Sequence, residues 1–228
     1  MKNNRLINLI NYTKLLLNNI CINFSPTIFA SSLSIEDMVL TDIILKEKFS
    51  IEIFTINTGF LHLETLKIIK YIKKKYNYKI FIIYPNRKDI NKYFLKFGIY
   101  AFYKKNYLRK KCCYIRKVKP LKKILKKYRS WITGRCIEQS LFRSILKIKE
   151  KDIINNNIKF NPLLFWQRKD IYKYIIKNKI PYNILYNKNY ESIGCKPCTR
   201  SILDKENIRS GRWWWEKNNL KECGIHYI

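Results

Sequence analysis

The sequence has no uninterrupted apolar run that approaches the roughly 20 residues needed to cross a bilayer. Its opening stretch, MKNNRLINLINYTKLLLNNI, has the pattern of an amphipathic helix and lacks the small-residue cleavage site of a secretory signal. Internal repeats and Gly/Ser-rich linkers are also missing. We therefore expect a cytoplasmic protein with no membrane partner, and 228 residues are enough for one good-sized domain.

Acidic residues are scarce. The chain has 16 Asp and Glu against 47 Lys and Arg, which gives a net charge of +31. A basic patch is the electrostatic footprint of phosphate binding, but here the lysines are scattered through nearly every segment. This distribution favours a solvated surface, so no specific nucleic-acid partner is expected. The charge would still attract small phosphorylated anions and acidic partner proteins.

Short apolar runs alternate with helical patterns along the chain. The runs are 26–30, 51–56, 78–84, 130–134 and 159–164, and the helical patterns are 34–48, 63–75, 89–97, 138–148 and 168–178. This alternation predicts an α/β fold with an open, mostly parallel sheet and helices on both faces. Such folds bind ligands beyond the carboxyl ends of their strands. From about Thr199 the periodicity fades, which predicts a mobile C-terminal tail over residues 199–228 after a domain over residues 1–198.

Seven cysteines, an odd number in a chain with no sign of export, indicate metal binding or catalysis before disulfides. Cys112 and Cys113 are adjacent, and Cys195 and Cys198 form a CxxC pair. Two thiolate pairs supply four soft ligands, suited to iron and sulfide or to zinc. Adjacent residues do not share a helix face, so both can reach one centre only if the backbone is distorted or the centre is large. This favours a cubane iron-sulfur cluster over zinc, and buried thiols without metal are the third interpretation.

Polar residues and glycines follow the predicted strands. Ser31, Ser32 and Ser34, the serine loop, lie where a strand turns into a helix, and N–H groups with hydroxyls there can bind an anion. An ordinary helix cap is the alternative. Two glycine turns lie on the rim where the fold places its cleft, and plain strand-to-helix turns explain them equally well. Their residues are Thr58, Gly59, Gly134 and Arg135.

The last 20 residues combine cations, tryptophans and a cysteine. Arg209 and Arg212 carry the planar donor fork that suits phosphate and sulfate. Three consecutive tryptophans, 213–215, cannot all face one core, so at least one should pack onto the body of the protein or across an interface. A cysteine brought among cations has a depressed pKa and acts as a nucleophile, and Cys223 is the candidate. On the residues alone, a terminal cysteine is more often incidental.

Together these residues resemble the sulfonucleotide reductases, specifically the iron-sulfur-containing adenosine 5′-phosphosulfate (APS) reductases of assimilatory sulfate reduction. The resemblance runs from about Ser31 to His226 and implies an adenine nucleotide alpha hydrolase-like, Rossmann-like fold, with a nucleotide-binding domain over residues 1–198. Six motifs carry it in the family's order: CCYIRKVKPL, NPLLFW, IPYNILY, SIGCKPCTR, GRWWWE and KECGIH.

The resemblance implies a role for each candidate residue. The cysteine quartet (Cys112, Cys113, Cys195 and Cys198) would hold a 4Fe-4S cluster. The residues implied in substrate binding are Ser31, Ser32, Ser34, Thr58, Gly59, Lys117, Gly134, Arg209 and Arg212, with His226 in the closing motif. Cys223 would attack the sulfur of APS, AMP would leave, and reduced thioredoxin would release sulfite from the resulting cysteine S-sulfonate.

The chain departs from the family pattern after Thr133-Gly134. Cys136 and Ile137 stand where the family usually carries arginine, so an anion contact is missing and Arg135 is the candidate to replace it. Asn57 and Arg109 stand near positions where relatives often carry aspartate and histidine. These departures concern substrate affinity more than reaction type.

Three other functions stay open at this point. A cluster-free relative acts on 3′-phosphoadenosine 5′-phosphosulfate (PAPS), although that branch generally lacks the cysteine quartet. An ATP-dependent RNA-thiolating enzyme of the same fold would bind RNA in a salt-sensitive way, but it leaves KECGIH unexplained. A zinc-stabilised binding module would have no catalysis. The sequence leaves the oligomeric state open, a homo-oligomer included.

Overall fold

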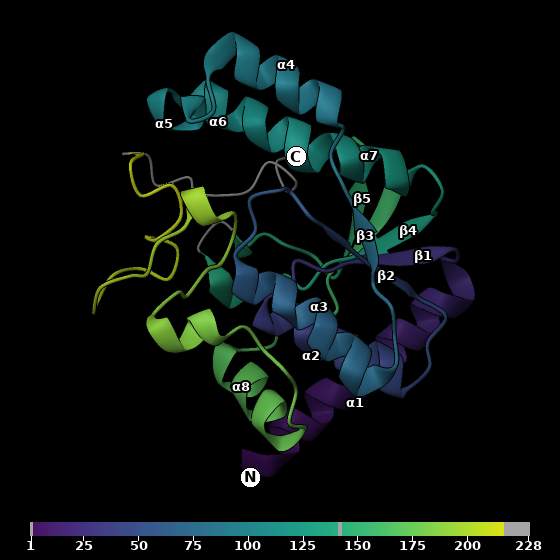
Figure 1. Ribbon diagram of the computed structural model, residues 1–228. Helices are drawn as coiled ribbons and strands as arrows, with labels where there is room; N and C mark the ends of the chain where they lie inside the picture. The colour runs from purple at the N-terminus through teal and green to yellow at the C-terminus, as the bar shows by residue number, and fades with distance from the viewer. Residues whose placement is uncertain (1, 141–142, 217–228) are drawn as a thin grey trace. The chain divides into compact units, whose positions relative to one another are not determined.

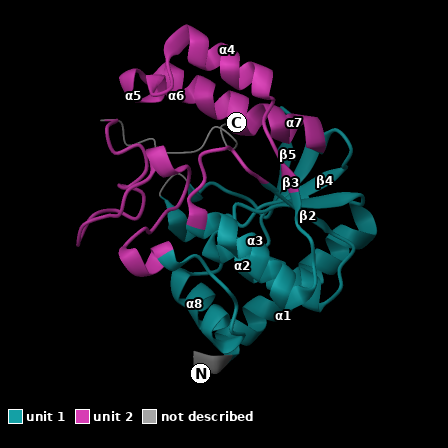
Figure 2. Ribbon diagram, viewed as in Figure 1, with its two compact units in different colours: residues 1–55, 64–81, 125–184 teal, residues 56–63, 82–124, 185–228 magenta. Residues whose placement is uncertain are grey.

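The computed structural model describes residues 2–140 and 143–216 (Figure 1). The chain forms two compact units, each built from separate stretches of sequence (Figure 2). Unit 1 consists of Met1–Thr55, Glu64–Phe81 and Leu125–Ile184, and unit 2 consists of Ile56–Leu63, Ile82–Ile124 and Leu185–Ile228.

The described residues contain a six-stranded sheet in the order β3-β2-β1-β4-β6-β5. The strands are β1 (Thr27–Ala30), β2 (Glu52–Ile56), β3 (Phe81–Ile83), β4 (Ser130–Ile132), β5 (Lys149–Asp152) and β6 (Asn157–Phe160). β1 runs parallel to β2 and β4, and β4 runs parallel to β6. Phe29, Ile53 and Trp131 are at most 1% exposed, as expected for parallel strands covered on both faces. The predicted open, mostly parallel α/β fold is confirmed.

The helices of unit 1 are joined by buried polar contacts. They are α1 (Lys2–Asn23), α2 (Ile35–Lys46), α3 (Leu63–Tyr76) and α8 (Arg168–Lys177). The fully buried carboxylate of Asp42 on α2 accepts hydrogen bonds from Tyr76 (2.6 Å) and Tyr174 (2.9 Å). Lys46 lies 2.9 Å from the same carboxylate. Three partners offset the cost of burying this charge, so Asp42 ties α3 and α8 to α2.

The predicted helix over residues 138–148 is wrong. Its described residues form a three-residue 3-10 turn, Ile137–Gln139, and irregular turns, and the chain then enters β5, which pairs antiparallel with β6. A tight turn joins the two strands, with Asn156 at a φ of 53° and the Asn155 amide bonded to Asp152. Asp152 also accepts a hydrogen bond from the indole of Trp131 at 3.0 Å. This buried anchor and the asparagine turn favour a hairpin over a helix.

Unit 2 contains α4 (Arg87–Phe97), α5 (Ala101–Lys104), α6 (Asn106–Cys113) and α7 (Lys119–Leu125). Asn86 caps α4 by accepting from the Lys88 and Asp89 amides, and Gly98 ends it at a φ of 90°. Within the described residues, no helix is both long and apolar enough to span a membrane.

The stretch from Thr199 to Glu216 packs within unit 2. The Arg200 amide donates to the Gly211 carbonyl at 3.0 Å, and the Trp213 amide donates to the Cys198 carbonyl at 3.1 Å. The Trp213 side chain is 1% exposed, so the prediction that a tryptophan packs onto the body of the protein is confirmed. The predicted division into a domain over residues 1–198 and a mobile tail stays a prediction.

Candidate active site

The serine loop forms a tight turn between β1 and α2. Ser34 caps α2 by accepting from the Asp37 amide at 3.4 Å. The amide and the hydroxyl of Ser32 both donate to the Asp37 carboxylate, at 2.6 and 2.5 Å. Ser31 accepts from the Leu33 amide at 3.2 Å. The cap interpretation therefore holds for Ser34, and the loop also presents a helix N-terminus of the kind that attracts anions.

Gly134 lies directly against the first turn of α2, which follows the serine loop in unit 1. A Cβ atom at Gly134 would lie 2.1 Å from Oδ1 of Asp37, which is far inside van der Waals contact. Glycine is therefore required, because any side chain would push Asp37 away from Ser32. Asp37 is the link between the two predicted elements that the sequence interpretation missed. Its position three residues after Ser34 matches a capping box, and that signal could have identified it.

Burial raises the pKa of Asp37 to about 6, and the hydrogen bonds from Ser32 only partly oppose this effect. A carboxyl group whose pKa is raised in the folded state stabilises the fold fully below its unfolded pKa and loses that contribution as the pH rises through the folded value.

The pH dependence of stability tests this environment. Relative to an Asp37→Asn variant, the wild-type free energy of unfolding should fall by up to ~3 kcal/mol as the pH rises from the ordinary Asp range to above about 6. Urea unfolding of both proteins across that range measures the difference. Parallel pH profiles would contradict the buried placement of the carboxylate.

Arg135 is engaged by a network inside unit 1. Its guanidinium pairs with Glu150 at 2.8 Å and donates to Asn161 at 3.2 Å, and Lys159 lies 2.6 Å from the same Glu150 carboxylate. Burial acts to raise the pKa of Glu150, but Lys159 and Arg135 outweigh it and the pKa is lowered. The geometry thus gives Arg135 a structural partner. Its predicted role in substrate binding stays a prediction.

Cys136, the next residue and one that differs from the family pattern, is buried. Cys136 is 3% exposed, and burial, followed by the charge of Glu36, raises the pKa of its thiol well above its usual value. A neutral thiol at this position offers no positive charge to a phosphate or sulfate.

Unit 2 holds all four members of the cysteine quartet, and none of them forms a disulfide within residues 2–140 and 143–216. Cys112 and Cys113 end α6, whereas Cys195 precedes the 3-10 turn Lys196–Cys198 and Cys198 ends it. Burial raises the pKa of Cys198, and the charges of Cys195 and Cys113 raise it further. Burial also raises the pKa of Cys112, and Cys195 again contributes. The structure therefore brings the two predicted pairs into electrostatic range of each other.

A backbone distortion follows the adjacent cysteines. The chain passes from α6 directly into a π-helical turn, Tyr114–Val118, before it continues as α7. π-Helical turns are rare and widen the helix locally, and they often occur at functional sites. Sequence reasoning required either a distorted backbone or a large centre for Cys112 and Cys113. The pair itself ends a regular α-helix, and the distortion begins one residue later.

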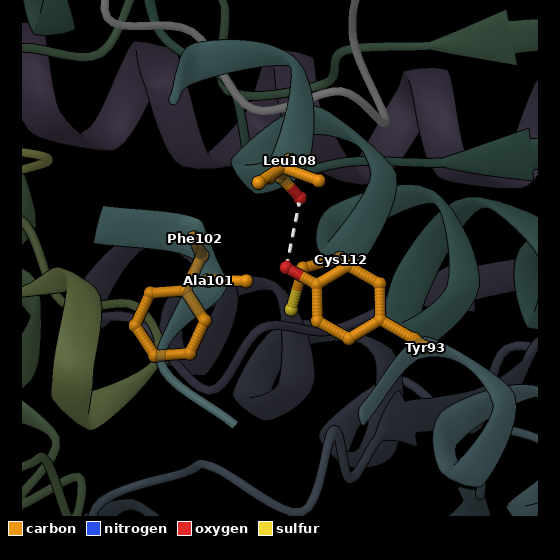
Figure 3. Close-up of a cluster of buried hydrophobic side chains, with 5 residues drawn as sticks. All are labelled: Tyr93, Ala101, Phe102, Leu108 and Cys112. Atoms are coloured by element: carbon orange, nitrogen blue, oxygen red, sulfur yellow. Dashed lines mark hydrogen bonds between the residues drawn. The ribbon is translucent and has the colours of Figure 1, made fainter. Parts of the chain in front are cut away.

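Cys112 sits in a compact core of unit 2. Its side chain packs with Tyr93, Phe102 and Leu108 (Figure 3). The Tyr93 hydroxyl donates to the Leu108 carbonyl at 3.2 Å, which fixes the ring beside α6. Burial is the main cause that raises the pKa of Tyr93, followed by the charge of Cys112, so the ring lies close to the thiol. The cysteine is therefore held rigidly on one side.

Two cations lie beside the quartet. Arg116 is buried, donates to the Thr58 carbonyl at 2.5 Å, and stacks 4.0 Å from the centre of the Phe60 ring. Gly59, at a φ of 77°, leaves room for it, because a Cβ there would lie 3.2 Å from the guanidinium. Lys117 lowers the pKa of both Cys112 and Cys198, which places its charge near both pairs.

The donor set of unit 2 fits a 4Fe-4S cluster chemically. No group of three or more His, Cys, Asp or Glu in the described part of the chain is arranged to hold one metal ion. The fit rests instead on four soft sulfur donors from two segments, each near the other, with Arg116 and Lys117 to balance the negative charge of a thiolate-bound cluster. The Thr58 hydroxyl, 3.2 Å from the Cys195 sulfur, is a further polar contact to this donor set.

The two predicted arginines meet near the CxxC turn. Arg209 and Arg212 donate to the Ser192 hydroxyl at 3.5 and 3.4 Å. A Cβ at Gly194 would lie 2.6 Å from the Arg212 guanidinium, so the arginine packs flat on the backbone next to Cys195. Two buried donors here, Nε of Arg212 and Nε1 of Trp213, have no hydrogen-bond partner among the described residues. Such donors are suited to an acceptor group of a ligand.

Two guanidinium groups contact the Trp213 ring, which sequence reasoning did not anticipate. Arg109 lies 4.5 Å and Arg212 4.6 Å from the ring centre. Arg109 also forms two hydrogen bonds to the Glu216 carboxylate, at 2.6 and 2.9 Å. These contacts fix the chain up to Glu216. The predicted nucleophile Cys223 and the predicted substrate residue His226 lie outside the described residues.

Comparisons with known proteins show the family to which the chain is similar. The family description "Phosphoadenosine phosphosulfate reductase domain" matches residues 26–201. An adenosine 5′-phosphosulfate reductase of Allochromatium vinosum is 42% identical over 92% of this chain and 82% of its own length. One of Burkholderia cepacia is 44% identical over 87% of this chain and 79% of its own length.

A solved structure shows the same fold. The phosphoadenylyl-sulfate reductase of Candida auris, crystallised as a phosphate complex, aligns with a TM-score of 0.71. The alignment covers 83% of this chain and 90% of that protein, at 22% sequence identity.

Proposed function

Because this chain belongs to the phosphoadenosine phosphosulfate reductase domain family, we propose that it reduces adenosine 5′-phosphosulfate to sulfite and AMP in the cytoplasm, in assimilatory sulfate reduction. The observation that carries the choice of substrate is the cysteine quartet gathered in unit 2. It fits the cluster-containing reductases that act on APS better than the cluster-free branch that acts on PAPS. The names of the relatives support the same choice.

In this proposal Cys112, Cys113, Cys195 and Cys198 hold a 4Fe-4S cluster. When bound, the cluster supplies a fixed centre of charge that orders the surrounding polar groups, and thiol exchange alone accounts for the two electrons of the reaction. Lys117, whose charge acts on both cysteine pairs, would lie between the cluster and the substrate. Arg116 positions Cys112 and Cys113, because its hydrogen bond to the Thr58 carbonyl fixes the turn that follows them.

The remaining residues bind the substrate. In unit 1 the serine loop and Gly134 bind the nucleotide through the α2 N-terminus. In unit 2 Thr58 and Gly59 also bind the nucleotide, and Arg209 and Arg212 bind the phosphosulfate. The unpaired Nε of Arg212 supports this assignment, because a sulfate oxygen would accept its hydrogen bond.

The reaction proceeds by nucleophilic substitution. The Cys223 thiolate attacks the sulfur of APS, the bond between sulfur and the AMP oxygen breaks, and a cysteine S-sulfonate forms. AMP leaves as an anion and needs no proton, so positive charge from Lys117, Arg209 and Arg212 contributes more than general acid catalysis. Reduced thioredoxin then attacks the Cys223 sulfur and releases sulfite.

A substrate comparison under anaerobic conditions tests the proposal. With reduced thioredoxin, purified protein should convert APS to equal amounts of sulfite and AMP, and PAPS should react much more slowly. Chromatography of AMP and 3′-phosphoadenosine 5′-phosphate, with sulfite derivatisation, measures both reactions. Faster turnover of PAPS than of APS would contradict the substrate assignment, and turnover of neither nucleotide would contradict the proposed reaction.

A further inference from the structure

A group of exposed aromatic rings lies on unit 2. Tyr103 is its centre, with ring centres 6.4 Å from Tyr100, 6.2 Å from Trp214 and 4.5 Å from Trp215. Tyr100 is 66% exposed, Trp214 39% and Tyr103 38%, and Trp215 is half-buried. We call Tyr100, Tyr103, Trp214 and Trp215 the aromatic patch. Contiguous exposed aromatic rings are uncommon on a surface that has no partner.

The sequence segment that carries Tyr100 and Tyr103 has charge of one sign. Residues 90–124, which include α5 and α6, contain many lysines and arginines but no aspartate or glutamate. Lys104 and Lys105 follow Tyr103 directly and are exposed. The carboxylate nearest in sequence to the patch, Glu216, is bound by Arg109. A partner that covers the patch should therefore carry negative charge around an apolar contact surface.

The patch lies at the base of the segment that carries the proposed nucleophile. Tyr103 donates to the Pro197 carbonyl at 2.6 Å, so the patch adjoins the CxxC turn. Trp214 and Trp215 lie between the anchored Trp213 and Glu216. Cys223 follows Glu216 by seven residues, so even a fully extended chain keeps it within about 25 Å of that anchor. A protein that covers the patch thus stays close to the sulfur that must be reduced.

We propose that the aromatic patch is the docking surface for the acidic protein dithiol that reduces the Cys223 S-sulfonate. The inference deepens the proposed function and rests on it. Aromatic side chains supply most of the binding energy in many protein interfaces, and complementary charge increases the rate of association. Lys104 and Lys105 would provide that charge next to the rings.

The chemical step is balanced by the partner's two thiols. One thiolate attacks the Cys223 sulfur, forms a mixed disulfide and expels sulfite. The partner's second thiolate then attacks its own sulfur in that mixed disulfide and releases the Cys223 thiolate. The partner is oxidised to a disulfide and supplies both electrons, and its two thiol protons pass to water.

Reduction of preformed S-sulfonate by two reductants separates docking from chemistry. The enzyme is first loaded with APS in the absence of thiol, and sulfite release is then followed with reduced thioredoxin or with dithiothreitol. Tyr100→Ala combined with Trp214→Ala should lower the second-order rate constant with thioredoxin about tenfold or more. The rate with dithiothreitol should not change, because a small thiol needs no docking surface.

A charge-reversal pair provides a second variant and its control. Lys104→Glu with Lys105→Glu should slow thioredoxin strongly at low salt and weakly at high salt. Lys126→Glu with Lys127→Glu changes another adjacent exposed pair, in unit 1, by the same charge and should have a much smaller effect.

Three results would overturn the docking surface while leaving the proposed function intact. The first is an unchanged rate with thioredoxin in both patch variants. The second is an equal loss of rate with thioredoxin and with dithiothreitol. The third is a patch variant that loses binding to single-stranded RNA but is reduced by thioredoxin at the normal rate. Failure of the wild-type protein to form any S-sulfonate would instead contradict the proposed function, and the docking proposal with it.

Discussion

Replacing Cys223 with serine is expected to abolish sulfite formation, with a loss of about 10⁴-fold or more, because the reaction has no other nucleophile in this account. A serine hydroxyl stays protonated at neutral pH and attacks sulfur poorly. Binding of APS should change little, because the serine loop and the arginine pair remain intact. Anaerobic turnover assays and calorimetric titration with APS measure the two quantities.

Cys21→Ser is the matched control for this experiment. Cys21 is a half-buried cysteine on α1 in unit 1, and no role is assigned to it. Its replacement should leave turnover within about twofold of the wild type, as expected for a surface substitution. Substantial sulfite production by the Cys223→Ser protein would overturn the assignment of the nucleophile.

Replacing Cys112 or Cys198 with serine is expected to remove the cluster. A serine oxygen is a harder ligand than a thiolate and binds iron-sulfur clusters poorly. Iron should fall from about four atoms per chain to near zero, with loss of the visible absorption of the cluster. Unit 2 should also lose stability, because Cys112 packs directly against Tyr93 and Leu108 (Figure 3).

Anaerobic purification followed by iron, sulfide and zinc analysis checks this result without any activity measurement. Cys136→Ser is the control, since Cys136 is also buried but lies in unit 1. It should keep the full iron content. A Cys112→Ser protein that retained four irons and its colour, or a wild-type protein that contained zinc in place of iron, would contradict the assignment of the quartet.

The parallel core could be predicted because its signal is local. The run 51–56 is short, apolar and followed by a helical pattern, so its length alone favours a buried strand. The β5–β6 hairpin could not, because Lys149–Asp152 contains no apolar residue and its stability depends on the distant indole of Trp131. An edge strand rich in charge gives little sequence signal even though its charges prevent edge-to-edge association.

The candidate site also contains some features that the sequence predicts and others that it does not. The CxxC spacing of Cys195 and Cys198 identifies them as candidate metal ligands. Their proximity to Cys112 and Cys113 is expected once all four are assumed to bind one centre. The π-helical turn after Cys113 has no sequence signature, because it depends on a shift of backbone hydrogen bonds.

Long-range ion pairs also have no local signal in the sequence. From the sequence, Arg135 was a candidate to bind an anion. In the structure, the β5–β6 hairpin brings Glu150 to Arg135, and the two residues form an ion pair. The pair of Arg109 and Glu216 spans 107 positions, so no local pattern reports it.

The most direct test of the central claim is the mass of the peptide that contains Cys223 after a single turnover. Protein prepared without oxygen is incubated with APS in the absence of any thiol, digested and analysed. This peptide alone should gain one SO₃ group, and one AMP should be released for each group gained. An unmodified Cys223 peptide in protein that has released AMP, or an SO₃ group on a different cysteine, would contradict the account.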